Sequence, residues 1–215
     1  MAEYLDVFDA SFAPAEPRRM ERKETHKSGA WHQTFDCWVL RRDSAGNKIV
    51  MQLRSMQKDS NPGLLDISAC GHLLAGEKPE DGVRELEEEL GLKARFDTLY
   101  YLGVVKEAID SPQRSIRHLS HTYFYETKLP LTAYKLQETE VDGVFEMNIA
   151  DGIKFFSGEA NSFEGAGFIK GKPVTRRFTR ADLTAAEDRC NVTKYYLKIF
   201  VLADLYLKGH RPLAV

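Results

Sequence analysis

The sequence is poor in cysteine, has no excess of basic residues and contains no long apolar run. Its three cysteines, Cys37, Cys70 and Cys190, have no metal-type spacing and cannot all pair, as in a reduced intracellular protein. The first residues show neither the basic nor the apolar region of a signal peptide, and no apolar run approaches the length of a membrane span. We therefore expect a cytoplasmic protein without a membrane partner.

Charges of the two signs nearly cancel, because 30 Lys and Arg face 32 Asp and Glu, for a formal net charge of -2. Domains that bind a nucleic acid polymer are usually basic, so this balance gives no support for such a partner. With 43% hydrophobic residues, the 215-residue chain can build one large core, and it shows no repeats. We expect a single domain over residues 1–215, with an N-terminal extension over about 1–30 and a C-terminal helical tail over about 180–215. The sequence leaves the oligomeric state open, a homodimer included.

The order of the elements predicts an α/β fold. Apolar patterning predicts strands over residues 4–8, 34–40, 48–53, 64–69, 99–107, 122–126 and 143–147. Helices are expected over residues 149–156, 182–189 and 192–207. Polar or glycine-bearing loops are expected over residues 10–29, 56–63, 110–117 and 157–173. Strands around one central helix, with further helices at the end, indicate a mixed sheet packed between helical layers.

The central helix is predicted within the stretch CGHLLAGEKPEDGVRELEEELGL, residues 70–92. Val83, Leu86 and Leu90 follow one another at helical spacing and form an apolar stripe. Pro79 suits the first turn of such a helix, and Gly91 suits its end.

The same helix carries four glutamates within six residues, and Glu85, Glu88 and Glu89 share one face because residues three and four apart are neighbours. Close carboxylates raise one another's pKa unless a positive charge lies among them. A solvated helix face is the ordinary explanation of a charge run. A shared divalent cation is the more specific one, since Mg²⁺ and Mn²⁺ prefer oxygen ligands and the backbone carbonyl of Gly71 lies just ahead of the helix. Such a cation orients a diphosphate and activates a water for attack on phosphorus.

These residues resemble the Nudix box: Gly71-x5-Glu77, followed by Arg84-Glu85-Leu86-x-Glu88-Glu89-x-Gly91-Leu92. The resemblance implies a Nudix-type α/β/α sandwich, Mg²⁺ or Mn²⁺ as cofactor, and Arg84, Glu85, Glu88 and Glu89 as catalytic residues. The family has seven residues between the first glutamate and the arginine, whereas this chain has six, residues 78–83. Because the apolar stripe is intact, we expect the missing residue to fall in the loop or first turn, which leaves the role of Glu77 open.

Segments between residues 7 and 147 also resemble the Nudix subgroup related to type I isopentenyl diphosphate isomerase; these include His32-Gln33-Thr34-Phe35, Leu53-Arg54-Ser55 and Cys70-Gly71-His72. By this resemblance, Cys70 takes the position of the catalytic cysteine. The resemblance further implies metal ligands at His26, His32 and His72, and diphosphate contacts at Arg54 and Lys58. Nudix enzymes often take a further ligand or base from a later loop, and Glu140 is the candidate here.

Each of these residues also has a simpler explanation. Cys70 fits a buried, inert thiol. His26 and His32 would then only bond loop carbonyls, and Arg54 and Lys58 would be ordinary surface cations.

Two departures from the isomerases favour hydrolysis. The isomerases carry paired carboxylates on the strand that corresponds to residues 117–123. This segment contains no carboxylate and offers His118 and His121 instead, which would lie in the pocket or on a solvated strand edge. Their Nudix box is commonly degraded, whereas this one is retained. We therefore predict a Mg²⁺- or Mn²⁺-dependent hydrolase of a small-molecule diphosphate, whose attached group is a nucleoside, a sugar, an isoprenoid or a cofactor. An isopentenyl diphosphate isomerase is the alternative, and a noncatalytic ligand-binding module is a third class that the retained carboxylates disfavour.

Overall fold

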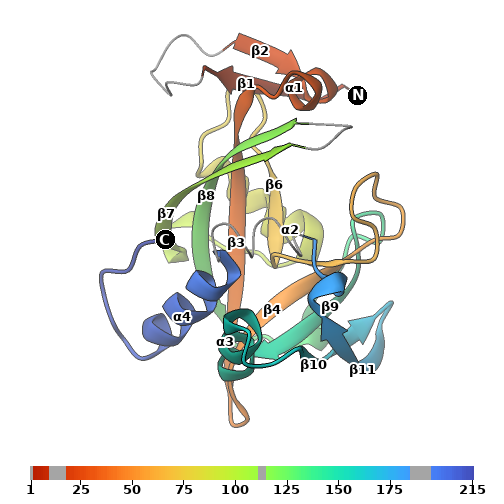
Figure 1. Ribbon diagram of the computed structural model, residues 1–215, viewed down its shortest axis with the longest axis vertical. Coiled ribbons are helices and arrows are strands. Elements are labelled where there is room, and N and C mark those ends of the chain that lie inside the picture. The colour runs from red at the N-terminus through yellow and green to blue at the C-terminus, as the bar shows by residue number, and fades with distance from the viewer. Residues whose placement is uncertain (1, 10–17, 111–114, 185–194) are drawn as a thin grey trace.

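The computed structural model describes residues 2–9, 18–110, 115–184 and 195–215. Within these ranges, eleven strands form one sheet whose main path runs β11-β10-β9-β4-β3-β1-β2 (Figure 1). At its centre, β3 (Trp31–Asp43) pairs antiparallel with β4 (Gly46–Arg54) and parallel with β8 (Ser115–Thr127). The predicted mixed sheet is therefore confirmed.

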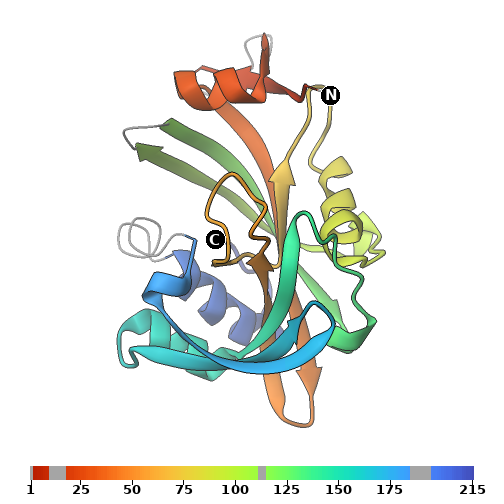
Figure 2. The ribbon, with the colours of Figure 1, turned by 90° about the vertical axis from the view of Figure 1, so that its right-hand side faces the viewer.

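Helices cover both faces of this sheet, as Figure 2 shows. Side chains alternate along β3, so Phe35, Cys37 and Val39 pack with α2 (Arg84–Leu90) on one face. Trp38 and Leu40 belong to the core on the other face, with α3 (Ile149–Ser157) and α4 (Tyr195–Leu207). The predicted α/β/α layering is confirmed, and α4 ends where the sequence predicts.

The remaining strands extend the sheet at its edges. Near the N-terminus, β1 (Tyr4–Phe8) pairs with β2 (Arg18–Glu21) and β3, and α1 (Arg22–Ser28) follows directly. Two short strands, β5 (Leu65–Asp66) and β6 (Ala69–His72), pair with β4 and β3, so the single strand expected over 64–69 is divided. The other strands are β7 (Tyr100–Asp110), β9 (Val141–Asn148), β10 (Ser162–Ile169) and β11 (Lys172–Thr179).

Three segments expected to be loops contain ordered elements. The loop over 110–117 was wrong at both ends, because β7 extends to Asp110 and β8 begins at Ser115, while residues 111–114 lie outside the described residues. The loop predicted over 10–29 was wrong for β2 and α1, because both have few apolar residues and so show no apolar pattern. β2 is a charged edge strand that is held by its pairing with β1. The loop over 157–173 was wrong for β10, where the glycines mark close packing: a Cβ on Gly167 would lie 2.0 Å from the carbonyl oxygen of Val144. The helix expected over 182–189 is a 3₁₀ turn at Arg180–Asp182, and residues 185–189 lie outside the described residues.

The central helix begins later than Pro79. The chain first makes a 3₁₀ turn, Asp81–Val83, and α2 follows from Arg84 to Leu90, ending at Gly91. Leu86 and Leu90 are fully buried, and Val83 packs at the margin of the same core. The stretch that is one residue short of the family pattern therefore lies ahead of α2, whose carboxylate face is intact.

The helical layer of α3 and α4 depends on close contact at one glycine. A Cβ on Gly152 would lie 2.1 Å from the ring of the buried Phe200. We expect Gly152→Ala to lower the free energy of unfolding by about 1–3 kcal/mol, because overpacking outweighs the helix propensity that alanine gains. Urea unfolding measures this, with Lys154→Ala on the exposed side of α3 as the control, expected within about 0.5 kcal/mol of wild type. A Gly152→Ala protein as stable as wild type would show that the two helices can separate without cost.

Candidate metal-dependent active site

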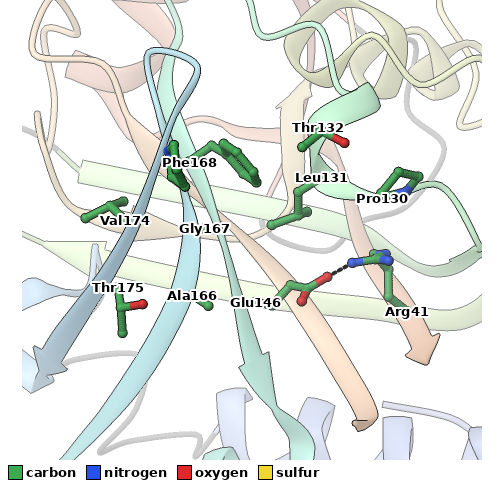
Figure 3. A pocket seen from close by; sticks show the side chains of 11 residues that line it. Arg41, Pro130, Leu131, Thr132, Glu146, Ala166, Gly167, Phe168, Val174 and Thr175 are labelled. Atoms are coloured by element: carbon green, nitrogen blue, oxygen red, sulfur yellow. Dashed lines mark ion pairs between the residues drawn. The ribbon is translucent and has the colours of Figure 1, made fainter. Parts of the chain in front are cut away.

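A cavity of about 580 Å³ gathers the residues that the sequence singles out. Its lining includes every predicted site residue except His32: His26, Arg54, Lys58, Cys70, Gly71, His72, Arg84, Glu85, Glu88, Glu89 and Glu140. A second cavity, of about 440 Å³, lies between β9–β11 and residues 130–132, and its wall carries the ion pair of Arg41 and Glu146 (Figure 3). Because none of the predicted residues lines the second cavity, the first is the candidate site.

The carboxylate face of α2 is more deeply buried than a solvated helix face. Glu85 and Glu89 are 8% and 6% exposed, whereas the side chain of Glu88 is 52% exposed at the rim. The carboxylate of Glu89 accepts hydrogen bonds from the backbone N–H of Cys70 and from the Gln52 amide, both at 3.0 Å. The two donors reach the same oxygen, Oε2, so they fix the orientation of the Glu89 carboxylate.

Gly71 on β6 lies directly against this face. A Cβ at this position would lie 2.1 Å from Oε1 of Glu85, so a larger residue would displace the carboxylate. The glycine thus brings the backbone of β6 close to the glutamates. The part of its carbonyl in metal binding stays a prediction.

Arg84 supplies the positive charge that the carboxylates need. Its guanidinium donates to both carboxylate oxygens of Glu77, at 3.0 and 3.1 Å, and to Glu88 at 3.0 Å. It also bonds Glu85 and, at 3.0 Å, the carbonyl oxygen of His72. Glu77, whose role the sequence left open, is therefore a partner of Arg84 and lies in the cavity lining.

Burial dominates the electrostatics of the two inner glutamates. It raises the pKa of Glu85 to about 7, although the neighbouring Arg84 opposes the shift. Burial and the charge of Glu85 raise the pKa of Glu89 to about 8, against the hydrogen bond from Cys70. A divalent cation would reverse this cost, because it favours the charged carboxylates.

Four histidines converge in the same region from four different elements: His26 of α1, His32 of β3, His72 of β6 and His118 of β8. One nitrogen from each ring lies within 4.8 Å of the corresponding nitrogens of the others. Burial lowers the pKa of His32 and lowers that of His72 well below its usual range, so both rings are neutral and can act as ligands. The structure thus brings His26, His32 and His72 together as predicted and adds His118.

The two cations expected to bind diphosphate are at the cavity, but both are paired. Arg54 donates to Asp66 at 2.9 Å and to the carbonyl oxygen of Ser60 at 3.0 and 3.1 Å. Lys58 forms an ion pair with Glu140. Their side chains are 12% and 21% exposed, so they are not ordinary surface cations.

Cys70 lines the cavity with a protonated thiol. Burial raises its pKa well above the usual range, and the nearby carboxylates of Asp66 and Glu89 add to this. The thiol is therefore a poor nucleophile at neutral pH.

Sequence reasoning missed three further groups at the site. Gln52 bonds Glu89, Asp66 bonds Arg54, and Glu107 of β7 approaches His118. Each is a polar residue in an otherwise strand-like segment, but only the pairing of strands shows where it points. His118 carried a signal, since it stands where the isomerases have carboxylates.

The geometry agrees with comparisons to known proteins. The family model of the NUDIX domain matches residues 30–163. An uncharacterized Nudix hydrolase from Clostridium acetobutylicum is 35% identical over 204 residues, which cover 94% of this chain and 96% of the relative. This chain is a member of the Nudix family. Membership of this family supports a hydrolase of diphosphate linkages, in agreement with the retained box.

Two other comparisons are partial. The isopentenyl-diphosphate Delta-isomerase of Rhodobacter capsulatus is 31% identical over 100 residues, 46% of this chain and 53% of the isomerase. A crystal structure of a protein from Deinococcus radiodurans matches with a TM-score of 0.52 at 17% identity, covering 73% of this chain and 90% of that protein, which shows that the two share a fold. No helix in the described part of the chain has the length and apolarity to cross a membrane.

The raised pKa of Glu89 predicts how the metal-free protein responds to pH. Its folded pKa of about 8 lies above the unfolded value of about 4.3, so the stability from its bound proton is complete below the unfolded pKa and is lost as the pH rises through 8. With a chelator present, the free energy of unfolding should fall between pH 7 and pH 9, by at most about 1.4 kcal/mol per pH unit from this group. Glu89→Gln should reduce that slope in urea unfolding. Equal slopes for the two proteins would show that Glu89 is ionised in the metal-free fold.

Proposed function

We propose that this protein is a Mg²⁺- or Mn²⁺-dependent hydrolase that cleaves the diphosphate linkage of a small molecule, with a nucleoside or an isoprenoid among the candidates for the attached group. The observation that carries the proposal is the buried carboxylate face of α2 at the wall of a 580 Å³ cavity. A noncatalytic binding module has no need for this arrangement, because burying several carboxylates together is costly without a cation.

Each group on the cavity wall has a role in this reaction. Glu85, Glu88 and Glu89 hold the divalent cation, together with the carbonyl oxygen of Gly71. Arg84 keeps Glu85 and Glu88 in position through charge-assisted hydrogen bonds. A cation bound here polarises the phosphoryl oxygen and lowers the pKa of a water.

Other groups are placed to meet the substrate. Arg54 and Lys58 contact the phosphates once these displace, at least in part, their present partners Asp66 and Glu140. Glu140 then becomes available as a base or a further ligand, which its position in the cavity lining supports. We further propose that His26, His32 and His72 bind a second metal ion in the same cavity.

The two most informative substitutions on α2 are Glu88→Gln and Glu89→Gln. Each keeps the shape of the side chain and removes a charged oxygen ligand, so we expect turnover to fall by about 100-fold or more while the protein stays folded. Glu89 lies on the polar side of the helix but is buried, and its replacement by glutamine retains an oxygen that can accept the bond from Cys70. The assay is phosphate release from a diphosphate panel at saturating Mg²⁺ or Mn²⁺, with products identified by ³¹P NMR.

Glu87→Gln is the matched control, because Glu87 lies on the same helix and, within the described part of the chain, forms its ion pair with the exposed Lys93. It should keep wild-type turnover. Near-normal turnover of both Glu88→Gln and Glu89→Gln would contradict the assignment of the cation site.

Isomerisation of isopentenyl diphosphate is the second candidate, and the position of Cys70 in the cavity favours it. The reaction moves a proton across a C=C bond and needs groups on opposite faces, yet residues 117–123 of β8 supply histidine and serine where carboxylates would be required. We therefore expect Cys70→Ala to retain phosphate release, and wild type to make no dimethylallyl diphosphate. NMR in D₂O tests both points. Deuterium uptake into isopentenyl diphosphate that disappears in Cys70→Ala would establish the isomerase instead.

A further inference from the structure

Two polar side chains of β3 form a floor for the candidate cavity. Thr34 and Asp36 line the cavity, and β3 runs side by side with β8, whose Ser120 and Thr122 lie opposite them in the register (Figure 1). Thr34 and Asp36 are only 5% and 4% exposed. Trp38, the next residue on this face of β3, belongs to the apolar core. The strand therefore changes from apolar to polar where it enters the cavity.

The hydroxyl groups at this floor are held in fixed positions. Thr34 donates a hydrogen bond to Oγ of Ser120 at 2.8 Å, and Thr122 donates to the carbonyl oxygen of Ser120 at 3.1 Å. Because the hydroxyl proton of Thr34 is used in this way, its oxygen can only accept a further bond. A carboxylate such as that of Asp36 is likewise an acceptor. A ligand group that meets this floor must therefore donate hydrogen bonds.

Asp36 lies close to the proposed cation site. It pairs in register with Cys70 of β6, whose backbone N–H donates to Glu89 at 3.0 Å. Burial raises the pKa of the Cys70 thiol, and the carboxylate charges of Asp66 and Glu89 raise it further. The charge of Asp36 adds to the same shift, so Asp36 and Glu89 lie near the same sulfur atom. Asp36 is thus placed to meet the group attached to a diphosphate on the cation.

The charges around the floor disfavour two kinds of attached group. A further phosphate or carboxylate would meet the carboxylate of Asp36, and like charges in a buried site repel each other. An ammonium group would meet the guanidinium of Arg54, which lines the same cavity and lowers the pKa of the same thiol against the larger effect of burial. A neutral hydroxyl group avoids both repulsions.

The cavity also offers few contacts to an apolar group. Among the described residues that line it, Ile67, Leu74 and Ile116 have aliphatic side chains, and none is Phe, Tyr or Trp. An isoprenoid chain would bury the carboxylate of Asp36 against hydrocarbon, which is costly for a charged group. A nucleobase would find no Phe, Tyr or Trp ring on which to stack.

We propose that the group attached to the diphosphate is a neutral, hydroxyl-bearing group of the sugar or polyol type, and that Asp36 is the specificity-determining residue that accepts hydrogen bonds from its hydroxyls. Two neighbouring hydroxyls can each donate to one oxygen of the carboxylate. Thr34, held by Ser120, accepts a further bond. The inference rests on the proposed function, because it concerns the substrate of the same site.

The test compares three diphosphates that differ in the attached group: ribose 5-diphosphate, 2-deoxyribose 5-diphosphate and isopentenyl diphosphate. Wild type should hydrolyse ribose 5-diphosphate with a kcat/KM about 100-fold or more above that for isopentenyl diphosphate, because a site built to bond hydroxyls rejects a group without them. The deoxy compound should fall about 10-fold below ribose 5-diphosphate, since one hydrogen bond to a charged group is lost.

Asp36→Ala should lower kcat/KM for ribose 5-diphosphate by about 10- to 100-fold, mainly through KM, because the bond is lost in ground and transition states alike. The value for isopentenyl diphosphate should not fall. Asp36→Asn, which keeps the shape of the side chain, should lose part of the preference. Cys37→Ala is the matched control and should keep the wild-type preference, because Cys37 neighbours Asp36 on β3 but packs in the core on the other face.

Equilibrium binding separates this inference from the proposed function. Calorimetry in Ca²⁺, which also takes oxygen ligands, measures the Kd of the three diphosphates and does not require hydrolysis. Tighter binding of ribose 5-diphosphate without hydrolysis of any of them would support the inference and contradict the proposed function. Equal or tighter binding of isopentenyl diphosphate, or an unchanged preference in both Asp36 variants, would overturn the inference. Circular dichroism identifies a variant that fails to fold, and the comparison of the three diphosphates in wild type then decides.

Discussion

The guanidinium of Arg84 is the interaction on which the site depends. It lies among the carboxylates of Glu77, Glu85 and Glu88 and also binds the backbone of β6 through His72. Without a cation at this place, the buried negative charges on α2 would repel one another and the helix could not pack so closely against the strand. Arg84 therefore stabilises the fold, apart from any part it has in a reaction. It joins the loop that carries Glu77, the helix and the strand into one wall of the cavity.

The residues of this wall could be predicted from the sequence because they are local. Glu85, Glu88 and Glu89 lie within five positions of one another, and helical geometry alone places them on one face. The intact stripe of Leu86 and Leu90 likewise predicted that the shortened part of the box would lie outside α2. The local pattern could not predict how deeply these carboxylates are buried. The burial of Glu89 comes from β4 and β6, whose Gln52 and Cys70 meet it only in the folded sheet.

Long-range strand pairing explains most of what sequence reasoning missed. Glu107 and His118 are eleven positions apart, and nothing in either strand alone indicates that they face each other. Similarly, β10 was hidden by its glycines, which are required by the close approach of β9 rather than by a turn. In both cases the information lies in the neighbour of a strand, which period-two patterning does not specify.

The parallel pairing of β3 with β8 places His32 opposite His118, and the antiparallel pairing of β8 with β7 places His118 opposite Glu107. Side chains alternate between the two faces of a strand, so sliding β8 by one residue would replace His118 with Arg117 or Leu119 on that face. Neither replacement can donate a lone pair to a metal ion. A metal ion bound by these histidines would therefore stabilise the native alignment of the central strands. It could not bind in the alignments shifted by one residue. Metal binding at the histidines would in this way favour the native register of β8 in the sheet.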